Sequence, residues 1–266
     1  MKDIKNIILI GSGNIATQLG IELKKKQFNI LQVYSRTLDS ARVLAKNIDA
    51  DFTNDIHKLQ TNADLYIVAI TDNAVKSVVS DIFLNDKLII HTSGSLPIQI
   101  LKNCSTNFGS IYPVQTFTKE SKINFKNLPL CLEATNDEAC NTLTSFAKKI
   151  SDNVQMISFE QKKYLHIAAV FANNFSNFMF NISEDILKKH DLSFDLLKPL
   201  IQATADKIAT HKPSEVQTGP AVRKDLNIIK KHLELLNTEP NYKEIYELIT
   251  KQIIYAKERR TQNNKL

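Results

Sequence analysis

Residues 7–16 read Ile7-Ile8-Leu9-Ile10-Gly11-Ser12-Gly13-Asn14-Ile15-Ala16, a continuous apolar run that ends at two closely spaced glycines. A second apolar run of the same continuous kind spans Leu65–Ile70. Strands with this composition are buried on both faces, which is typical of a parallel sheet covered by helices on each side. Strand and helix patterns alternate around these runs, so the sequence predicts an α/β fold with a doubly wound parallel sheet.

The alternation of strands and helices extends to about residue 156, and the strand patterns then stop. The expected strands are Asn6–Ile10, Ile30–Tyr34, Ala50–Phe52, Leu65–Ile70, Leu88–His91, Asn107–Tyr112, Leu128–Glu133 and Asn153–Met156. The expected helices between them are Asn14–Lys26, Leu38–Asn47, Asn73–Phe83 and Asp137–Ile150.

From residue 157 onward only helical patterns follow. Ser158 and Gln161 have the spacing of a capping box, which begins a long helix that reaches about His190. The later helices are expected at Ser193–His211, Pro220–Leu236 and Tyr242–Arg260. We therefore expect a Rossmann domain at residues 1–156 and an all-α domain at residues 157–266.

The two glycines and the following alanine form a G-x-G-x-x-A motif at the first strand-to-helix turn. In such a motif Gly11 permits the tight turn, Gly13 lets the backbone approach a pyrophosphate, and Ala16 allows close packing of the helix on the strand. The free N–H groups and the dipole at the start of the helix favour an anion. The alternative is a glycine turn that binds nothing. We expect a dinucleotide to bind at Gly11, Ser12, Gly13, Asn14, Ile15 and Ala16.

The end of the second strand indicates which dinucleotide binds. An NAD-dependent enzyme usually has Asp or Glu there to accept the ribose 2′-OH, whereas this chain has Ser35-Arg36-Thr37. A guanidinium can hold a 2′-phosphate through two hydrogen bonds, so we expect the cofactor to be NADP(H). The alternative is a solvated Arg36 with Thr37 capping the next helix. Asp39 lies too far into that helix to act as the ribose acid.

Two later strand ends complete the expected cofactor crevice, because ligands of open α/β sheets bind outside the carboxyl ends of strands. We expect contacts from Ile70, Thr71, Asp72, Thr92 and Ser93. The main role expected for Asp72 is that of an N-cap. His91 fits two roles equally well, a proton donor near the nicotinamide or a histidine bonded to backbone.

Several segments along nearly the whole chain resemble one known family. The segments are the Gly11–Gly20 fingerprint, Ser35–Thr37, His91–Gly94, Tyr112–Phe117, Ala168–Asn174 and Thr218–Asp225. They resemble Rossmann-like proteins that carry a C-terminal helical domain of unknown function. The N-terminal half is also similar to deazaflavin-dependent NADP oxidoreductases and pyrroline-5-carboxylate reductases, and the architecture to 6-phosphogluconate and β-hydroxyacid dehydrogenases.

The resemblance implies a reductase in which the helical domain mediates dimerisation and a small substrate binds between the two domains. It does not name the substrate. A deazaflavin co-substrate would follow from the resemblance alone, because no residue requires it.

The chain departs from the β-hydroxyacid dehydrogenases at their catalytic lysine. Those enzymes place a Lys one turn before an Asn on the interdomain helix, but here the matching position is Ala169 or Val170, depending on whether Asn173 or Asn174 is the Asn. Positions 166, 170, 173 and 177 share one face at 3.6-residue spacing. We expect His166 and Asn173 to serve catalysis, with His166 as proton donor. The alternative is a structural His166 in the core and asparagines that bond buried backbone.

A second anion site is expected where the segment Thr218-Gly219-Pro220 begins a helix. Thr218 or Gly219 is suited to the N-cap position and Pro220 to the first helical turn. With Arg223 one turn on, such a terminus suits a substrate carboxylate or phosphate. The alternative is an ordinary helix start in which Arg223 pairs with a carboxylate.

The composition narrows the class of protein further. The chain has 266 residues and a net charge of +6, of which +2 falls on residues 1–157 and +4 on residues 158–266. This even spread does not predict a nucleic-acid surface. The three cysteines lack metal-ligand spacing, and the apolar runs are too short for a signal peptide or a membrane span. We expect a soluble cytoplasmic protein without nucleic-acid or membrane partners.

Two functions of different classes remain open from the sequence. The first is a reductase that uses NADPH on a C=O or C=N group. The second is a non-enzymatic NADP(H) sensor, which the missing lysine leaves open. A methyltransferase is disfavoured, because Arg36 stands where that class has an acid. The helical half also carries more apolar surface than its own core needs, which predicts a homodimer.

Overall fold

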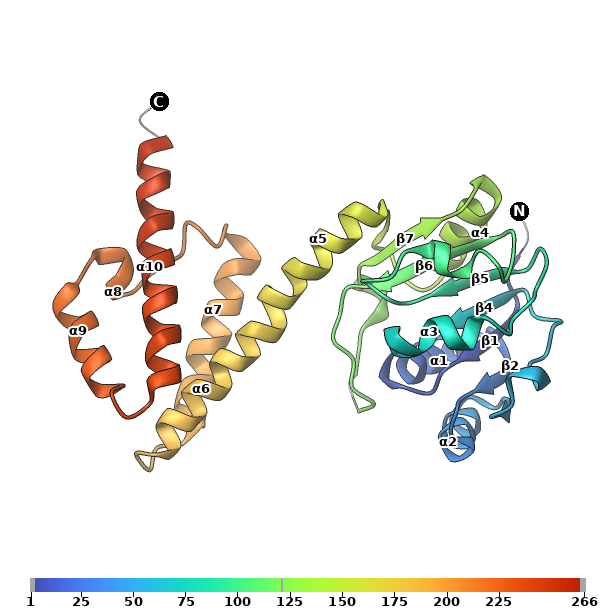
Figure 1. Cartoon of the computed structure of the whole chain (residues 1–266), viewed down its shortest axis with the longest axis horizontal. Coiled ribbons are helices and arrows are strands. Elements are labelled where there is room, and N and C mark those ends of the chain that lie inside the picture. The colour runs from blue at the N-terminus through green and yellow to red at the C-terminus, as the bar shows by residue number, and fades with distance from the viewer. Residues whose placement is uncertain (1–2, 121, 264–266) are drawn as a thin grey trace. The chain divides into compact units, whose positions relative to one another are not determined.

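The computed structural model describes residues 3–120 and 122–263. The chain forms two compact units, Met1–Asn173 and Asn174–Leu266 (Figure 1). Among the described residues, all the strands lie in the first unit and the second unit contains only helices. The expected order of an α/β half followed by an all-α half is therefore confirmed, whereas a functional boundary at 156/157 stays a prediction.

The first unit is built on one eight-stranded sheet with the order β3-β2-β1-β4-β5-β6-β7-β8. Neighbouring strands are parallel from β3 through β6, which confirms the doubly wound parallel sheet for that part. β7 runs antiparallel to β6, so the sheet is mostly parallel and contains one antiparallel pair. Among its described residues, the connection from Pro113 to Leu130 contains a short 3₁₀ turn and no α-helix, whereas parallel strands are usually joined by a crossover helix.

All eight expected strands are present, and their ends differ from the expected ones by at most two residues. Their bounds are β1 Asn6–Ile10, β2 Asn29–Tyr34, β3 Asp51–Thr53, β4 Leu65–Val68, β5 Leu88–His91, β6 Phe108–Pro113, β7 Leu130–Ala134 and β8 Val154–Met156. The helices that accompany the sheet are α1 Asn14–Lys25, α2 Leu38–Ile48, α3 Asp72–Val79 and α4 Asp137–Lys148.

The continuous apolar runs are explained by burial on both faces of the sheet. Ile7 and Leu9 belong to the core beneath α1, α2 and α4, whereas Ile8 and Ile10 belong to the core beneath α3. All four side chains are completely buried. Because alternate residues of a strand point to opposite faces, only an unbroken apolar sequence can fill both cores.

One helical stretch leads out of the sheet and continues into the second unit. It comprises α5 Phe159–Ala169, a π-helical segment Val170–Phe175, and α6 Ser176–Lys188. The capping box at Ser158 is confirmed, because the hydroxyl accepts from the backbone of Gln161 and the amide of Gln161 accepts in return. The π-helical segment breaks the 3.6-residue spacing, so the expectation that positions 166, 170, 173 and 177 share one face is wrong.

The second unit contains α6, a 3₁₀ turn at Phe194–Leu197, and four further helices. They are α7 Lys198–Thr210, α8 Pro220–Arg223, α9 Leu226–Leu235 and α10 Pro240–Asn263. A single helix over Pro220–Leu236 is a wrong expectation, because Lys224 adopts a left-handed conformation with φ of 56° and Asp225 then caps α9. None of the helices in the described ranges is long and apolar enough to cross a membrane.

Candidate functional site

The turn between β1 and α1 has a backbone geometry that requires glycine. Gly11 has a φ of 128°, and its N–H donates to the carbonyl of Tyr34 over 2.7 Å. A Cβ at Gly11 would lie 2.2 Å from the carbonyl oxygen of Ala69. At Gly13, the N-cap of α1, no described atom lies within 4 Å of a Cβ position, so the backbone N–H groups are open to a bulky anion. The turn fits the pyrophosphate of a dinucleotide.

The end of β2 lies directly beside this turn. The hydroxyl of Ser12 donates to Ser35 over 2.8 Å and so joins the two segments. Arg36 is exposed and has neither a hydrogen bond nor an ion pair within the described chain. Thr37 occupies the N-cap position of α2 but makes no side-chain cap bond there, as far as the structure describes it. The guanidinium and this hydroxyl are therefore available to a ligand.

The first turn of α1 is held by the segment that follows β6. The amide of Asn14 donates to the carbonyl of Phe117 over 2.9 Å. One turn on, the amide of Gln18 donates to the carbonyls of Thr118 and Lys119. Asn14 thus holds the segment around Phe117 beside the glycine turn. Ala16 is completely buried against the sheet.

The ends of β4 and β5 carry the remaining expected cofactor residues. Ile70 is half-buried beside Gly11, and Thr71 is exposed. Thr92 is only 4% exposed, so little of its side chain faces solvent. The hydroxyl of Ser93 accepts from the backbone N–H groups of Ser95 and Leu96 and stabilises its own turn.

Asp72 does not have its expected role. Thr71 occupies the N-cap position of α3, and Asp72 is the first residue inside the helix. Its carboxylate accepts a hydrogen bond from the hydroxyl of Ser95 instead. The extended backbone of Thr71 moves the helix start back by one residue, so the N-cap expectation for Asp72 is wrong.

Three polar contacts join α5 and its π-helical end to β6 and the segment after it. The Nζ of Lys162 lies 3.1 Å from Ser110, the Nδ1 of His166 lies 3.2 Å from the hydroxyl of Tyr112, and the amide of Asn173 donates to Thr116 over 2.6 Å. We call these three contacts the α5–β6 ladder. Of the two residues expected to serve catalysis, His166 therefore contacts the carboxyl end of β6, and Asn173 contacts the segment that follows it.

Gly94 fixes the middle contact of this ladder. A Cβ at Gly94 would lie 2.7 Å from the ring of Tyr112 and 2.9 Å from the Nδ1 of His166. The two rings are packed edge to face, with centroids 5.8 Å apart. Burial raises the pKa of Tyr112, with a smaller contribution from Cys131, so its phenol stays protonated at neutral pH.

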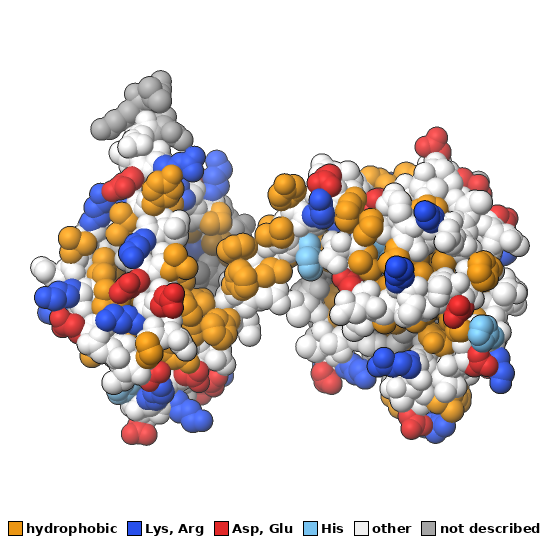
Figure 2. All heavy atoms as spheres, viewed as in Figure 1, with side chains coloured by type: hydrophobic (Ala, Val, Ile, Leu, Met, Phe, Trp, Pro, Cys, Tyr) orange, Lys and Arg blue, Asp and Glu red, His pale blue; other side chains and the backbone are white. Residues whose placement is uncertain are grey.

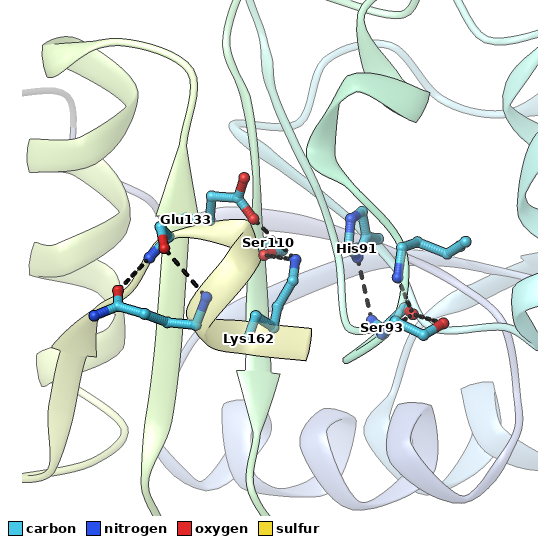
Figure 3. A network of polar contacts seen from close by, with 9 residues as sticks. His91, Ser93, Ser110, Glu133 and Lys162 are labelled. Atoms are coloured by element: carbon cyan, nitrogen blue, oxygen red, sulfur yellow. Dashed lines mark hydrogen bonds and ion pairs between the residues drawn. The ribbon is translucent and has the colours of Figure 1, made fainter. Parts of the chain in front are cut away.

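A buried charge cluster lies at the foot of the ladder (Figure 3). Ser110 pairs in register with His91 on β5 and with Glu133 on β7, so these three side chains form a row on one face of the sheet. Lys162 is completely buried, and its Nζ lies 2.9 Å from a carboxylate oxygen of Glu133. Burial lowers the pKa of Lys162, and the hydrogen bond and charge of Glu133 oppose that shift.

His91 is the other fully buried ionisable group of this row. Its Nδ1 accepts from the backbone N–H of Ser93 over 3.2 Å, so the backbone-bonded role is confirmed. Its Nε2 has no hydrogen-bond partner within the described residues. Burial and, to a smaller extent, the charge of Lys162 lower the pKa of His91 to about 4 against the opposing effect of Asp72. His91 is therefore neutral at physiological pH, with its proton on Nε2.

The second anion candidate lies in the helical unit. Gly219 occupies the N-cap position with a φ of 112°, and Pro220 follows at the first helical position, as expected. The helix α8 that they begin has only four residues. Thr218 and Gly219 line a pocket of about 340 Å³ whose other walls are mostly apolar side chains of α6 and α10. Arg223 is exposed and does not line this pocket.

Two families match consecutive parts of the sequence. Residues 6–94 match the family described as NADP oxidoreductase coenzyme F420-dependent. Residues 128–253 match a domain of unknown function, DUF2520. A comparison with curated proteins found no match.

Solved structures match over almost the entire chain. The crystal structure of BF3122 from Bacteroides fragilis, a candidate NADP oxidoreductase, is 39% identical, covers 95% of this chain and 98% of its own, and superposes with a TM-score of 0.86. The chain belongs to this family of NADP oxidoreductases. Protein TM1727 from Thermotoga maritima (24% identity, 95% and 99% coverage, TM-score 0.79) and a reductive aminase from Aspergillus terreus in complex with NADPH (14%, 98% and 95%, 0.71) share the fold.

Within this NADP oxidoreductase, sequence reasoning missed the partners of His166. Ser110 and Tyr112 are two residues apart on β6, and Lys162 and His166 are one turn apart on α5. Glu133 ends the apolar run of β7. A polar residue inside an otherwise apolar strand was the signal available, because such a residue needs a buried partner.

Proposed function

We propose that this NADP oxidoreductase transfers a hydride between NADP(H) and the C=O or C=N group of a small substrate. The observation that carries the proposal is the Gly11 turn beside an unpaired Arg36. The turn leaves backbone N–H groups open to a pyrophosphate, and Arg36 with Ser35 and Thr37 recognises the 2′-phosphate. When bound, the cofactor supplies the hydride.

His166 supplies the proton that accompanies hydride transfer. The Nδ1 of His166 lies 3.2 Å from the hydroxyl of Tyr112, which leaves Nε2 on the side of the ring away from Tyr112. In the reducing direction the imidazolium form of His166 gives its Nε2 proton to the substrate oxygen or nitrogen as the hydride reaches the substrate carbon. This leaves a neutral ring with its proton on Nδ1, and solvent then reprotonates Nε2. Asn173, held by Thr116, orients the same group. The anion-binding role of Thr218, Gly219 and Arg223 stays a prediction.

The proposed recognition of the 2′-phosphate is tested by binding measurements. Arg36→Ala is expected to weaken NADPH binding by roughly ten- to a hundredfold, as for loss of a charged hydrogen bond, and to leave NADH binding unchanged. Arg42→Ala is the matched control, because Arg42 lies on the neighbouring helix and pairs with Asp39 at 3.2 Å. Isothermal titration calorimetry measures both affinities. Equal losses for NADPH and NADH would contradict the role of Arg36, and no saturation by either would overturn the proposal.

Turnover is tested by following NADPH absorbance with a panel of small keto and imino acids. His166→Asn is expected to abolish consumption of NADPH while leaving its affinity unchanged. A separate arm offers NADP⁺ with a reduced deazaflavin. Tight binding of NADPH without turnover of any compound would instead favour a sensor of the cofactor.

We also propose that the protein forms a homodimer through its helical unit. Large apolar side chains on α7 and α10 are exposed, among them Leu200 at 63% and Leu248 at 58% (Figure 2). Such a surface is typical of an interface between subunits. Light scattering at micromolar concentration is expected to give twice the mass of one chain, and a monomer would contradict it.

A further inference from the structure

The α5–β6 ladder has one contact that differs in kind from the other two. The contact between Asn173 and Thr116 is exposed, and the contact between His166 and Tyr112 is partly buried. Lys162 at the foot is completely buried and carries a charge. The foot is therefore the contact that is hardest to rearrange, because its ammonium has no access to water.

The foot and the middle contact are coupled by the periods of the two elements. Lys162 and His166 are four residues apart, so they lie on the same face of α5 one turn apart. Ser110 and Tyr112 are two residues apart, so they lie on the same face of β6. A rotation or slide of α5 that moved His166 away from Tyr112 would also remove Lys162 from Ser110.

Such a movement is opposed by the cost of an unpaired buried charge. The ammonium of Lys162 is held by Glu133 at 2.9 Å, by Ser110 at 3.1 Å and by the ring of Phe159 at 5.3 Å. An unpaired ammonium inside a protein is strongly destabilising, because nothing replaces the hydration that it loses. The ion pair therefore has a single favourable register of α5 on β6 and β7, which is the best-attested use of a buried charge.

The middle contact has little tolerance for error. A single carbon added at Gly94 would overlap both rings, so there is no spare room between this residue and the pair. A small displacement of His166 would therefore either break its bond to Tyr112 or press its ring against Gly94. The direction in which Nε2 points depends on that bond, because the contact between Nδ1 and the Tyr112 hydroxyl fixes the orientation of the ring.

We propose that Lys162 is a positioning residue, which fixes α5 on Ser110 and Glu133 so that His166 keeps its bond to Tyr112. The role rests on the proposed function only in that His166 is the proton donor. Lys163 has no such role, because its exposed ammonium pairs with Glu160 on the same helix at 2.7 Å.

The main test uses the double variant Lys162→Met/Glu133→Leu. Removing the whole ion pair leaves no unpaired buried charge, so this variant is expected to fold even if the single variant Lys162→Met does not. Histidine labelled with ¹⁵N then reports the Nδ1 resonance of His166, which is assigned by its loss in His166→Asn. Tyr112→Phe gives the resonance of a broken contact, and Lys163→Met is the matched control.

In the double variant the Nδ1 resonance is expected to move towards the Tyr112→Phe value, and in Lys163→Met to stay at the wild-type value. A folded double variant with the wild-type resonance would overturn the proposal. So would an equal displacement in Lys163→Met, because the effect would then not depend on the buried pair.

A kinetic measurement separates this proposal from the proposed function. With whichever keto or imino acid of the panel is turned over, the double variant is expected to lower kcat by about ten- to a hundredfold, as for a misplaced catalytic group, with unchanged affinity for NADPH. An unchanged kcat would overturn the positioning role. If no compound is turned over by the wild type, the proposed function fails, and the resonance of His166 alone decides the role of Lys162.

Discussion

The two compact units differ in how many of their apolar side chains are buried. Among the described residues, Met1–Asn173 contains 44 of the buried apolar residues, whereas Asn174–Leu266 contains three, Ile182, Ala221 and Ile229. Of the residues that the structure describes, 13 large apolar side chains are exposed in the helical unit and eight in the larger N-terminal unit. The sheet thus completes a core of its own, and the helical unit as a single chain does not.

The difference indicates that the two units are stabilised in different ways, one by its own core and the other by contacts with a second chain. A strand such as β1 fills a core on each face, and its stability does not depend on another molecule. The helices of the second unit present apolar faces that a second copy of the chain would cover in the proposed homodimer. The stability of the helical unit should therefore depend on protein concentration, and that of the sheet should not.

Matched Leu→Ala substitutions in the two units give the largest expected effect. Leu9 is completely buried at the centre of the sheet, so Leu9→Ala is expected to lower the free energy of unfolding by about 2–5 kcal/mol. Hydrogen exchange followed by mass spectrometry measures this for the strand peptides. The loss should be the same at all protein concentrations.

The companion substitution Leu248→Ala tests the helical unit. Leu248 is 58% exposed in the single chain, where its removal would change the free energy of unfolding by no more than about 0.5 kcal/mol. In the proposed dimer the loss should be larger and should increase on dilution. A small loss that is independent of protein concentration would contradict the proposed difference between the units, because the helical unit would then be stable as a monomer.

The sheet could be predicted from the sequence because its signals are local. All eight strands follow from apolar runs and turn residues, and burial on both faces explains why those runs are continuous. The direction of β7 could not be predicted, because nothing in the run Leu130–Ala134 distinguishes parallel from antiparallel pairing. The π-helical segment at Val170–Phe175 and the left-handed Lys224 likewise lack a distinctive residue pattern.

The residues of the candidate site also fall into those that local sequence patterns identify and those that only the structure identifies. The glycine turn and Arg36 lie within 30 residues of each other, and their roles follow from known local chemistry. The α5–β6 ladder joins residues 52 to 57 positions apart in the sequence. Periodicity identifies the face of each element but not its partner, so Lys162 and Tyr112 could be assigned only from the structure.

An effect of intermediate size is expected for the pH dependence of stability, which tests whether water is excluded from His91 in the core of the first unit. The pKa of His91 is lowered from 6.5 to about 4, so the folded state binds fewer protons than the unfolded state between these values. Its contribution to stability is complete above pH 6.5 and is lost as the pH falls towards 4. At 1.36 kcal/mol per unit, the loss amounts to roughly 3 kcal/mol.

His91→Asn is the control. The side-chain carbonyl oxygen of the new asparagine can accept from the N–H of Ser93, and an asparagine side chain does not titrate. Urea unfolding from pH 7 to pH 4 is expected to show a loss in the wild type that exceeds the loss in His91→Asn by this amount. Parallel curves for the two proteins would mean that water reaches His91, and the contrast between the units would be weaker than the burial indicates.

The smallest expected effect lies at the capping box between the last strand and α5. Ser158→Ala removes the hydroxyl that accepts from the backbone of Gln161, so it is expected to cost about 1 kcal/mol. Thr71→Ala is the control, because Thr71 is an N-cap without a side-chain cap bond in the described chain, and it should cost only a few tenths. Hydrogen exchange in the first turn of each helix, measured without cofactor, compares the two. Equal losses would mean that α5 is held by the buried pair of Lys162 and Glu133 rather than by its own cap, because a helix fixed by tertiary contacts gains little from local capping.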